Sequence, residues 1–435
     1  MKRIITQKLI NWKMEENRKP LILRGARQIG KTYSVVEFGI KHFKGKLHIV
    51  DLEKHPKLIK IFEKDLNPTR ILSEIEISIE KKINVMEDLL FIDEVQNSKK
   101  ALSSLRYFYE EMPELHIIAA GSLIEFALQN ISFPVGRVQT ITMYPMNFYE
   151  YLVAREKEIS AEAIITSPLN TYSEVLHIHL LDELRNYFFV GGMPEAVMEY
   201  IKTEKIRSAF EVQKDLIAAF RQDFSKYAGR SDKKCLNDVF ISTAKSVGKQ
   251  LKYNHLSDGF SIPTIKKAFE LLEDAKIIYK IYSTSPAGLP LEVGVLNKVF
   301  KPLFLDIGLM QQACGLQVGD EYAKDNLLSI YKGALAEQFV GQELLSTSDT
   351  ELFYWSRNRK SSNAEIDYLV TKKGEIFPIE VKSGPAGKLK SLHLLLQKYK
   401  NISNSFVLST GEYSYLPEQK ITFLPLYYAY WLAKS

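Results

Sequence analysis

The stretch Leu21–Thr32, LILRGARQIGKT, constrains this chain more than any other part of its sequence. It is typical of a short apolar strand that runs into a G-x-x-x-x-G-K-T loop and then a helix. Gly25 and Gly30 permit backbone angles and close approaches that a Cβ would prevent, so successive N–H groups can point at phosphate oxygens. Lys31 can reach the β- and γ-phosphates, and the Thr32 hydroxyl can bind Mg²⁺. The stretch therefore predicts a nucleotide site at the positive end of a helix, over residues Gly25, Ala26, Arg27, Gln28, Ile29, Gly30, Lys31, Thr32 and Tyr33.

A second stretch, Leu89–Gln96 (LLFIDEVQ), places two acids at the end of an apolar run. A continuous apolar run favours a buried parallel strand, and such sheets bind ligands at the carboxyl ends of their strands. Asp93 is then placed to hold Mg²⁺, directly or through water. Glu94 is placed to orient and deprotonate an attacking water.

Two further residues follow apolar runs of the same region. Ser122 comes after HIIAAG, where it either senses the γ-phosphate or caps the helix expected over 123–129. Arg137 precedes a strand expected over 138–143. It is either a finger that reaches the nucleotide of a neighbouring subunit, which implies a homo-oligomer, or one half of an ion pair within the chain.

The alternation of strands and helices up to residue 155 predicts a doubly wound parallel α/β sheet. GARQIGKT, LLFIDE, AAGS and VGRV together resemble the AAA-type P-loop ATPase module of a widespread prokaryotic ATP-binding family, which is similar to archaeal-type and STAND-like ATPases. The resemblance implies a sheet of the ASCE/AAA type, ATP and Mg²⁺. It also implies roles in phosphate binding, magnesium binding, water activation and sensing for Gly30, Lys31, Thr32, Asp93, Glu94 and Ser122.

The middle of the chain is expected to be helical over 156–230, a lid or linker, and winged-helix-like over 231–320. Gly191-Gly192-Met193-Pro194 cannot continue a helix and predicts a tight turn between two helices. This turn either couples the nucleotide to the next domain or is an ordinary connection. An amphipathic helix over 263–274 followed by a strand has the order of a winged helix. In winged helices that bind DNA, a helix of this kind enters the major groove.

The last part, 321–435, carries a second set of charged residues. A helix holds Glu337, and a strand hairpin holds Asp367, Glu380 and Lys382. Alternation along the second strand puts Glu380 and Lys382 on one face. Two acids that hold Mg²⁺ or Mn²⁺ beside a lysine suit metal-dependent phosphodiester hydrolysis. The alternative is that these charged residues form salt bridges on a polar face of the hairpin.

This constellation resembles the PD-(D/E)xK restriction-endonuclease-like fold, a smaller α/β domain. The resemblance makes Asp367 and Glu380-Val381-Lys382 the motif, with Asp367 and Glu380 as metal ligands and Glu337 as an accessory acid. Ile366 stands where the motif's name has proline. Such a fold does not by itself imply cleavage.

Composition limits the setting of the protein. Two cysteines, Cys235 and Cys314, fit a reducing compartment, and neither a long apolar segment nor a signal peptide is evident, so we expect a cytoplasmic protein without membrane partners. A net charge of +6 is compatible with DNA but does not establish it. The sequence predicts an ATPase that is a switch or motor, with a terminal domain that binds or cleaves DNA. The alternative is a regulatory ATPase whose terminal domain is an inactive protein-interaction module.

Overall fold

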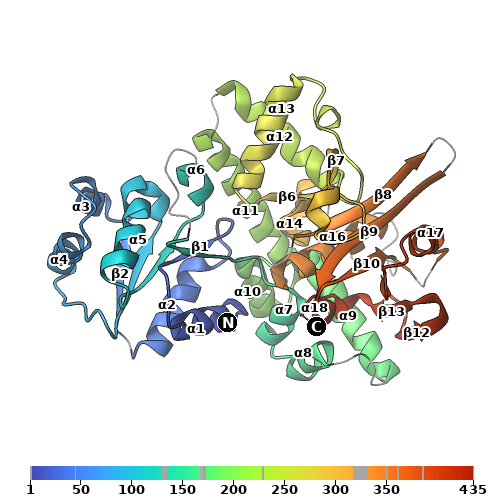
Figure 1. The fold of residues 1–435 in the computed structure, drawn as a ribbon, viewed down its shortest axis with the longest axis horizontal. Coiled ribbons are helices and arrows are strands. Elements are labelled where there is room, and N and C mark those ends of the chain that lie inside the picture. The colour runs from blue at the N-terminus through green and yellow to red at the C-terminus, as the bar shows by residue number, and fades with distance from the viewer. Residues whose placement is uncertain are drawn as a thin grey trace. The chain divides into compact units, whose positions relative to one another are not determined.

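The structure is a computed structural model that describes residues 2–44, 46–128, 136–166, 168, 173–227, 230–316, 332–347, 351–359, 362–384 and 387–434. The chain divides into two compact units (Figure 1). The first comprises Met1–Tyr144 with Asp274–Lys276, and the second comprises Pro145–Glu273 with Ile277–Ser435. The predicted start of the terminal domain, residue 321, lies outside the described residues.

The first unit is built on a parallel sheet of five strands in the order β2-β3-β4-β1-β5. Its strands are β1 (Leu21–Arg24), β2 (Leu47–Asp51), β3 (Leu89–Asp93), β4 (His116–Ala120) and β5 (Gln139–Thr142). Its helices are α1 (Ile5–Met14), α2 (Lys31–His42), α3 (Ile59–Glu63), α4 (Pro68–Ile79), α5 (Lys99–Glu111) and α6 (Ile124–Leu128), with short 3-10 turns η1 (Pro56–Leu58) and η2 (Val95–Asn97). The predicted parallel α/β sheet is confirmed.

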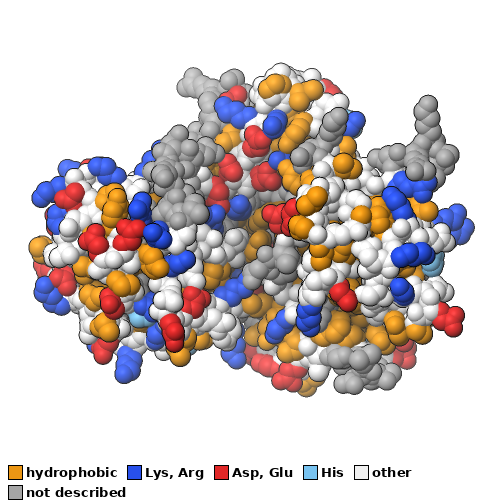
Figure 2. Space-filling model, viewed as in Figure 1, with side chains coloured by type: hydrophobic (Ala, Val, Ile, Leu, Met, Phe, Trp, Pro, Cys, Tyr) orange, Lys and Arg blue, Asp and Glu red, His pale blue; other side chains and the backbone are white. Residues whose placement is uncertain are grey.

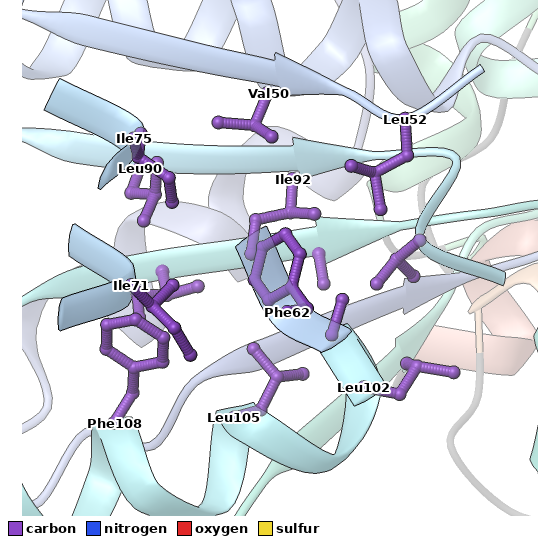
Figure 3. Close-up of a cluster of buried hydrophobic side chains, with 14 of the residues drawn as sticks. Val50, Leu52, Phe62, Ile71, Ile75, Leu90, Ile92, Leu102, Leu105 and Phe108 are labelled. Atoms are coloured by element: carbon purple, nitrogen blue, oxygen red, sulfur yellow. The ribbon is translucent and has the colours of Figure 1, made fainter. Parts of the chain in front are cut away.

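The core of this unit explains why β3 is an uninterrupted apolar run. All five of its residues are buried. Leu90 and Ile92 face a cluster to which α3, α4 and α5 contribute, with Phe62 and Phe108 among its largest side chains (Figure 3). Helix α2 contacts β3 and β4, and its buried side chains are not part of that cluster. With helices on both faces, every β3 side chain meets protein, as a strand of a doubly wound sheet requires.

The second unit combines a helical region with a mixed sheet of eight strands. The sheet order is β12-β13-β11-β10-β9-β8-β6-β7. Its strands are β6 (Ile278–Ser283), β7 (Leu296–Phe304), β8 (Phe353–Arg359), β9 (Ser362–Lys372), β10 (Glu375–Val381), β11 (Ser405–Ser409), β12 (Ser414–Leu416) and β13 (Ile421–Pro425). Its helices are α7 (Phe148–Ala154), α8 (Glu158–Ile165), α9 (Glu174–Val190), α10 (Pro194–Thr203), α11 (Ile206–Tyr227), α12 (Arg230–Lys245), α13 (Ile262–Asp274), α14 (Ile307–Ala313), α16 (Lys332–Thr347), α17 (Lys390–Lys398) and α18 (Ala429–Lys434).

The terminal region has the element order that the sequence predicts. Helix α16 is followed by the antiparallel strands β8, β9 and β10, then by α17 and by β11, which pairs parallel to β10. Side chains of α17 cover one face, where Leu392 and Leu395 pack with Ile366 and Val407. Because β10 is interior to this sheet, Glu380 on that strand is held inside the fold.

The predicted winged helix is not confirmed. Helix α13 is present, and β6 and β7 form an antiparallel hairpin after it. However, β6 also pairs parallel to β8, so the hairpin extends the terminal sheet. Lys266 and Lys267, on the exposed face of α13, lie 3.6 and 3.8 Å from the carboxylates of Glu270 and Asp232.

Charged side chains of both signs are interspersed over the visible face of the first unit (Figure 2). Within the described part of the chain, none of the helices is both long and apolar enough to span a membrane.

Candidate functional site

The sheet order of the first unit brings three predicted segments together. Strand β4 lies between β1 and β3, and all three run parallel. Their carboxyl ends are followed by Gly25, by Glu94 and by Gly121, so the phosphate loop, the acidic pair and Ser122 meet at one edge of the sheet. Such an edge is where ligands bind in parallel α/β sheets.

The phosphate loop is held by its own backbone and by Lys31. Gly30 has φ 89°, in the left-handed region, immediately before α2 begins at Lys31. A Cβ on Gly25 would lie 2.3 Å from the Met143 carbonyl oxygen, so this position must be glycine. Lys31 Nζ donates to the carbonyl oxygens of Gly25 (2.9 Å) and Ala26 (2.7 Å) and to Ser122 Oγ (3.0 Å). The phosphate loop thus surrounds an ammonium group that a bound phosphate can contact.

Two residues with the chemistry of magnesium ligands meet beside this ammonium. Thr32 Oγ1 donates to Asp93 Oδ2 at 2.7 Å, although 61 residues separate them in the chain. Asp93 Oδ1 accepts from the backbone N–H of Glu94 at 3.0 Å. A hydroxyl and a carboxylate so placed fit Mg²⁺, which takes few protein oxygens and completes its shell with phosphate and water.

Burial sets the electrostatics of this edge. It lowers the pKa of Lys31 to about 8, against the opposing pull of Glu94 and Asp93. It also raises the pKa of Asp93, because the carboxylate loses water that the Thr32 hydroxyl only partly replaces. Both groups therefore carry charges that are costly in the free protein. A bound phosphate and a divalent cation would compensate them.

Glu94 is positioned by its backbone and by a residue that sequence reasoning missed. Its φ of 49° lies in the left-handed region, which turns the chain sharply after β3. Gln96 Nε2 donates to Glu94 Oε2 at 2.5 Å. A Cβ on Gly121 would lie 2.0 Å from Gln96 Oε1, so Gly121 leaves the space that Gln96 fills. The only sequence signal for Gln96 is its place two residues after Glu94.

The remaining predicted residues divide by exposure. Ala26 and Ile29 are buried, and the Ile29 carbonyl accepts from Arg3, another residue that sequence reasoning missed. Arg27 and Gln28 are more exposed than these two residues, and Tyr33 is 54% exposed.

Arg137 lies 3.0 Å from Glu110 on α5, and its side chain is 48% exposed. An ion pair within the chain was one of the two alternatives that the sequence offered for Arg137.

The predicted glycine turn connects α9 to α10 in the second unit. Asp306 Oδ2 accepts from the Gly192 N–H at 2.6 Å, and the Met146 N–H donates to the Gly192 carbonyl at 2.7 Å. A Cβ on Gly192 would lie 1.9 Å from the Met146 carbonyl oxygen. Asp306 is fully buried, and burial raises its pKa to about 6 against three backbone N–H donors. The turn is therefore a buried polar junction, and a link from it to the nucleotide stays a prediction.

The second predicted constellation also comes together, around a residue that was not predicted. Asp367 Oδ2 accepts from the Val381 N–H at 2.8 Å, and Lys382 Nζ lies 2.5 Å from Glu380 Oε1. Lys301 on β7 lies 3.2 Å from Asp367 Oδ1 and 2.8 Å from Glu337 Oε2. Lys301 also lies 2.6 Å from a further acid, Glu365 Oε1 on β9.

Burial and neighbouring charges shift the pKa values of Glu337, Glu380 and Lys301 in this cluster. It raises the pKa of Glu337 to about 8, with the charge of Asp367 adding to the effect. It raises the pKa of Glu380 to about 7, where Asp367 again adds and Lys382 opposes. Burial alone would lower the pKa of Lys301, but the surrounding carboxylates together raise it well above its ordinary value. The surrounding carboxylates therefore favour the charged form of Lys301.

Sequence reasoning missed Lys301 because it stands in the apolar run over 299–305, which predicts only packing. The signal was the isolated charge itself, since a lone lysine in a buried strand needs acidic partners. Among the described residues, no group of three or more His, Cys, Asp or Glu could hold a metal ion. The second metal expected in this region thus has no support from the side-chain arrangement.

Comparison with known proteins separates the two parts of the chain. Residues 17–152 match the AAA domain family, whereas residues 181–320 and 332–429 each match a domain of unknown function. An uncharacterized protein of Methanocaldococcus jannaschii is 25% identical over 275 residues. That match covers 61% of this chain and 56% of the relative, so the chain spans little more than half the length of the relative.

Several solved structures have partial similarity to this chain. A Walker-type ATPase of Pyrococcus abyssi is 16% identical, with a TM-score of 0.46 over 72% of this chain and 96% of that chain. The RuvB Holliday junction branch migration motor of Thermotoga maritima is 15% identical, with a TM-score of 0.29 over 64% and 90%. AMPPCP-bound DnaA from Aquifex aeolicus is 16% identical, with a TM-score of 0.29 over 62% and 87%.

The family match and the site agree on the first unit. Residues 17–152 match the AAA domain family, and the phosphate loop, Asp93 and Ser122 converge at one edge of the parallel sheet of this unit. The first unit of this chain thus combines a match to the AAA domain family with the geometry of a phosphate-binding site.

Proposed function

We propose that the first unit binds Mg·ATP and hydrolyses it slowly, as a switch or motor. The observation that carries the proposal is the contact of 2.7 Å between Thr32 Oγ1 and Asp93 Oδ2 next to the Lys31 ammonium. The start of a helix supplies this hydroxyl and the end of a strand supplies this carboxylate, at the place where a phosphate chain would lie. Bound Mg²⁺ would neutralise charge on the β- and γ-phosphates.

The residues of the chain divide the work of hydrolysis. Lys31 leaves the carbonyls of the loop and pairs with phosphate oxygens. Glu94 orients a water and accepts its proton, and Gln96 holds the carboxylate of Glu94 in place. Ser122, at 3.0 Å from Lys31 Nζ, is placed to register the γ-phosphate once the lysine moves. This contact supports the sensing alternative for Ser122.

Equilibrium binding tests the nucleotide site itself. We expect Lys31→Ala to weaken binding of a non-hydrolysable ATP analogue with Mg²⁺ at least about tenfold, since it removes a charged hydrogen bond to phosphate. Thr32→Val should weaken binding only when Mg²⁺ is present. Lys57→Ala, at an exposed lysine of the same unit, is the matched control. Equal affinity in Lys31→Ala and in the control would refute the site.

Arg137 is the part of the proposal that concerns assembly. Its exposure and its place just before β5 support a finger that acts on a neighbouring copy, whereas the Glu110 pair supports a role within one chain. The loss of a residue that acts across an interface can be complemented by mixing subunits. A mixing experiment therefore distinguishes a finger on a neighbouring copy from an ion pair within one chain.

For the second unit we propose that the terminal domain has the restriction-endonuclease-like fold and contacts nucleic acid. The order from α16 to β11 supports the fold, with Asp367 and Glu380 on adjacent strands. Residues 383–411 contain no acidic residue, and their lysines are all exposed on and around α17, where Lys and Arg side chains are visible in Figure 2. These are Lys388, Lys390, Lys398 and Lys400.

Salt-dependent DNA affinity tests the second proposal. Neutralising the lysines around α17 to glutamine should lower affinity and flatten its dependence on salt, because fewer counterions are released. The control neutralises the same number of exposed lysines in the first unit, namely Lys54, Lys57, Lys60 and Lys64. Absence of salt-dependent affinity in the wild type would refute nucleic-acid binding and leave the protein-interaction alternative.

A further inference from the structure

Lys301 lies at the centre of the acidic cluster in the second unit. Its side chain is 3% exposed and has carboxylate oxygens of Glu337, Glu365 and Asp367 within 3.2 Å of Nζ. The partners come from α16 and β9, whereas Lys301 comes from β7, the last strand in the sheet order. One ammonium thus joins three elements inside the fold.

This ammonium uses the oxygens that a divalent metal would need. Mg²⁺ and Mn²⁺ bind carboxylate oxygens at about 2.0–2.3 Å. The nearest oxygens of Glu337 and Asp367 are already hydrogen-bonded to Lys301, at 2.8 and 3.2 Å. An ion bound to both would lie against Nζ, where two like charges in a buried site repel strongly.

The third candidate ligand is also engaged. Glu380 Oε1 lies 2.5 Å from Lys382 Nζ, and Asp367 Oδ2 accepts from the Val381 N–H. Among the described residues Glu380 Oε2 has no hydrogen-bond partner although it is buried, and this observation favours a further ligand. One buried carboxylate oxygen without a partner does not by itself hold a divalent ion, which needs several oxygen ligands at once.

We propose that Lys301 is the resident cation of this site and takes the place of a divalent metal. The residues of the nuclease-like motif are then present without the metal chemistry that the motif usually serves, and the terminal domain does not cleave phosphodiesters by metal-activated water. The proposal goes beyond the proposed ATPase function and does not depend on it, because it concerns residues of the second unit alone.

Removal of the Lys301 charge would then create a binding site for a divalent metal ion, which the wild type lacks. Lys301→Met keeps an unbranched apolar stem but removes the charge, so it leaves the oxygens of Glu337, Glu365 and Asp367 without a counterion. We expect the melting temperature to fall by roughly 5–10 °C, because buried carboxylates lose their partner. Millimolar Mn²⁺ should restore much of this loss, since a ligand that binds only the folded state stabilises it.

The experiment counts bound Mn²⁺ by the loss of its free electron paramagnetic resonance signal, on the full chain without nucleotide. The wild type should bind as many ions as Asp367→Asn. Lys301→Met should bind one ion more per chain, and the double variant Lys301→Met/Asp367→Asn should lose that ion. Lys280→Met is the matched control, because Lys280 also lies on this sheet, has a side chain that is only 6% exposed, and pairs with Glu273 at 2.7 Å. It should gain no ion.

Two results would overturn the proposal. One is a Mn²⁺ ion in the wild type that is lost in Asp367→Asn, since this would show a metal at the motif despite Lys301. The other is a folded Lys301→Met that gains no ion. If Lys301→Met does not fold, the comparison of the wild type with Asp367→Asn decides alone. Binding of nucleotide by the first unit is measured separately, so failure of either proposal is distinguishable.

Discussion

The pKa of Lys31 makes nucleotide affinity depend on pH in a way that the structure specifies. Burial lowers this pKa to about 8 in the free protein. Phosphate oxygens beside the ammonium favour its charged form, so the pKa is higher in the complex. Above pH 8 the free protein has lost the proton that the complex keeps, and binding must take one up. Affinity therefore falls as pH rises through about 8.

The magnitude follows from the same pKa. Between pH 7.5 and 9.5 the dissociation constant should rise about 25-fold, or about 2 kcal/mol, and approach tenfold for each further pH unit. Phosphate groups with a second pKa near 6 are ionised throughout this range and do not contribute. Isothermal titration calorimetry with a non-hydrolysable ATP analogue and Mg²⁺, in two buffers of different ionisation enthalpy, measures both the affinity and the proton taken up.

Two variants make this test decisive. Lys31→Met should bind weakly with no pH dependence over the range, and Lys57→Ala should follow the wild type. A wild-type affinity that stays constant from pH 7.5 to 9.5 would refute the reasoning. The same would hold if Lys31→Met showed the wild-type slope, because the titrating group would then lie elsewhere.

Three further predictions concern positioning, packing and assembly. Gln96→Ala should slow ATP hydrolysis roughly tenfold at unchanged nucleotide affinity, because the carboxylate of Glu94 loses its donor; equal losses in both would contradict a positioning role. Gly192→Ala should lower the free energy of unfolding by about 3 kcal/mol, because its Cβ would lie 1.9 Å from the Met146 carbonyl oxygen, and an unchanged melting temperature would contradict this. If Arg137→Ala impairs hydrolysis, mixing with chains that carry Arg137 but a disabled phosphate loop should restore activity; no rescue would favour the ion pair within one chain.

The arrangement of the first candidate site could be predicted because its residues lie in short local patterns. The phosphate loop fixes its own geometry within a few residues, and Asp93 ends a strand that only a doubly wound sheet buries on both faces. The rule that parallel strands end at one edge then brought Thr32 next to Asp93 across 61 residues. Ser122 followed from the same rule. Gln96 did not, because its contact to Glu94 depends on a turn that no pattern specifies.

The second site shows where sequence reasoning stops. Asp367, Glu380 and Lys382 share one hairpin, so strand alternation sufficed to group them. The position of Lys301 depends on β6 pairing with β8, a parallel contact between distant segments. That pairing also explains why the winged helix was not found as predicted, since the strand expected after the amphipathic helix extends the terminal sheet together with β7. Pairings of this kind are set by tertiary packing rather than by local periodicity.

Single-turnover hydrolysis of Mg·ATP by the wild type and by Glu94→Gln tests the central claim most directly, with nucleotide affinity measured on the same samples. The substitution keeps the size of the side chain and removes the base. We predict that affinity stays within a few-fold while the hydrolysis rate falls about 100-fold or more. An unchanged rate in Glu94→Gln would contradict the assignment of this edge of the sheet as the site of ATP hydrolysis.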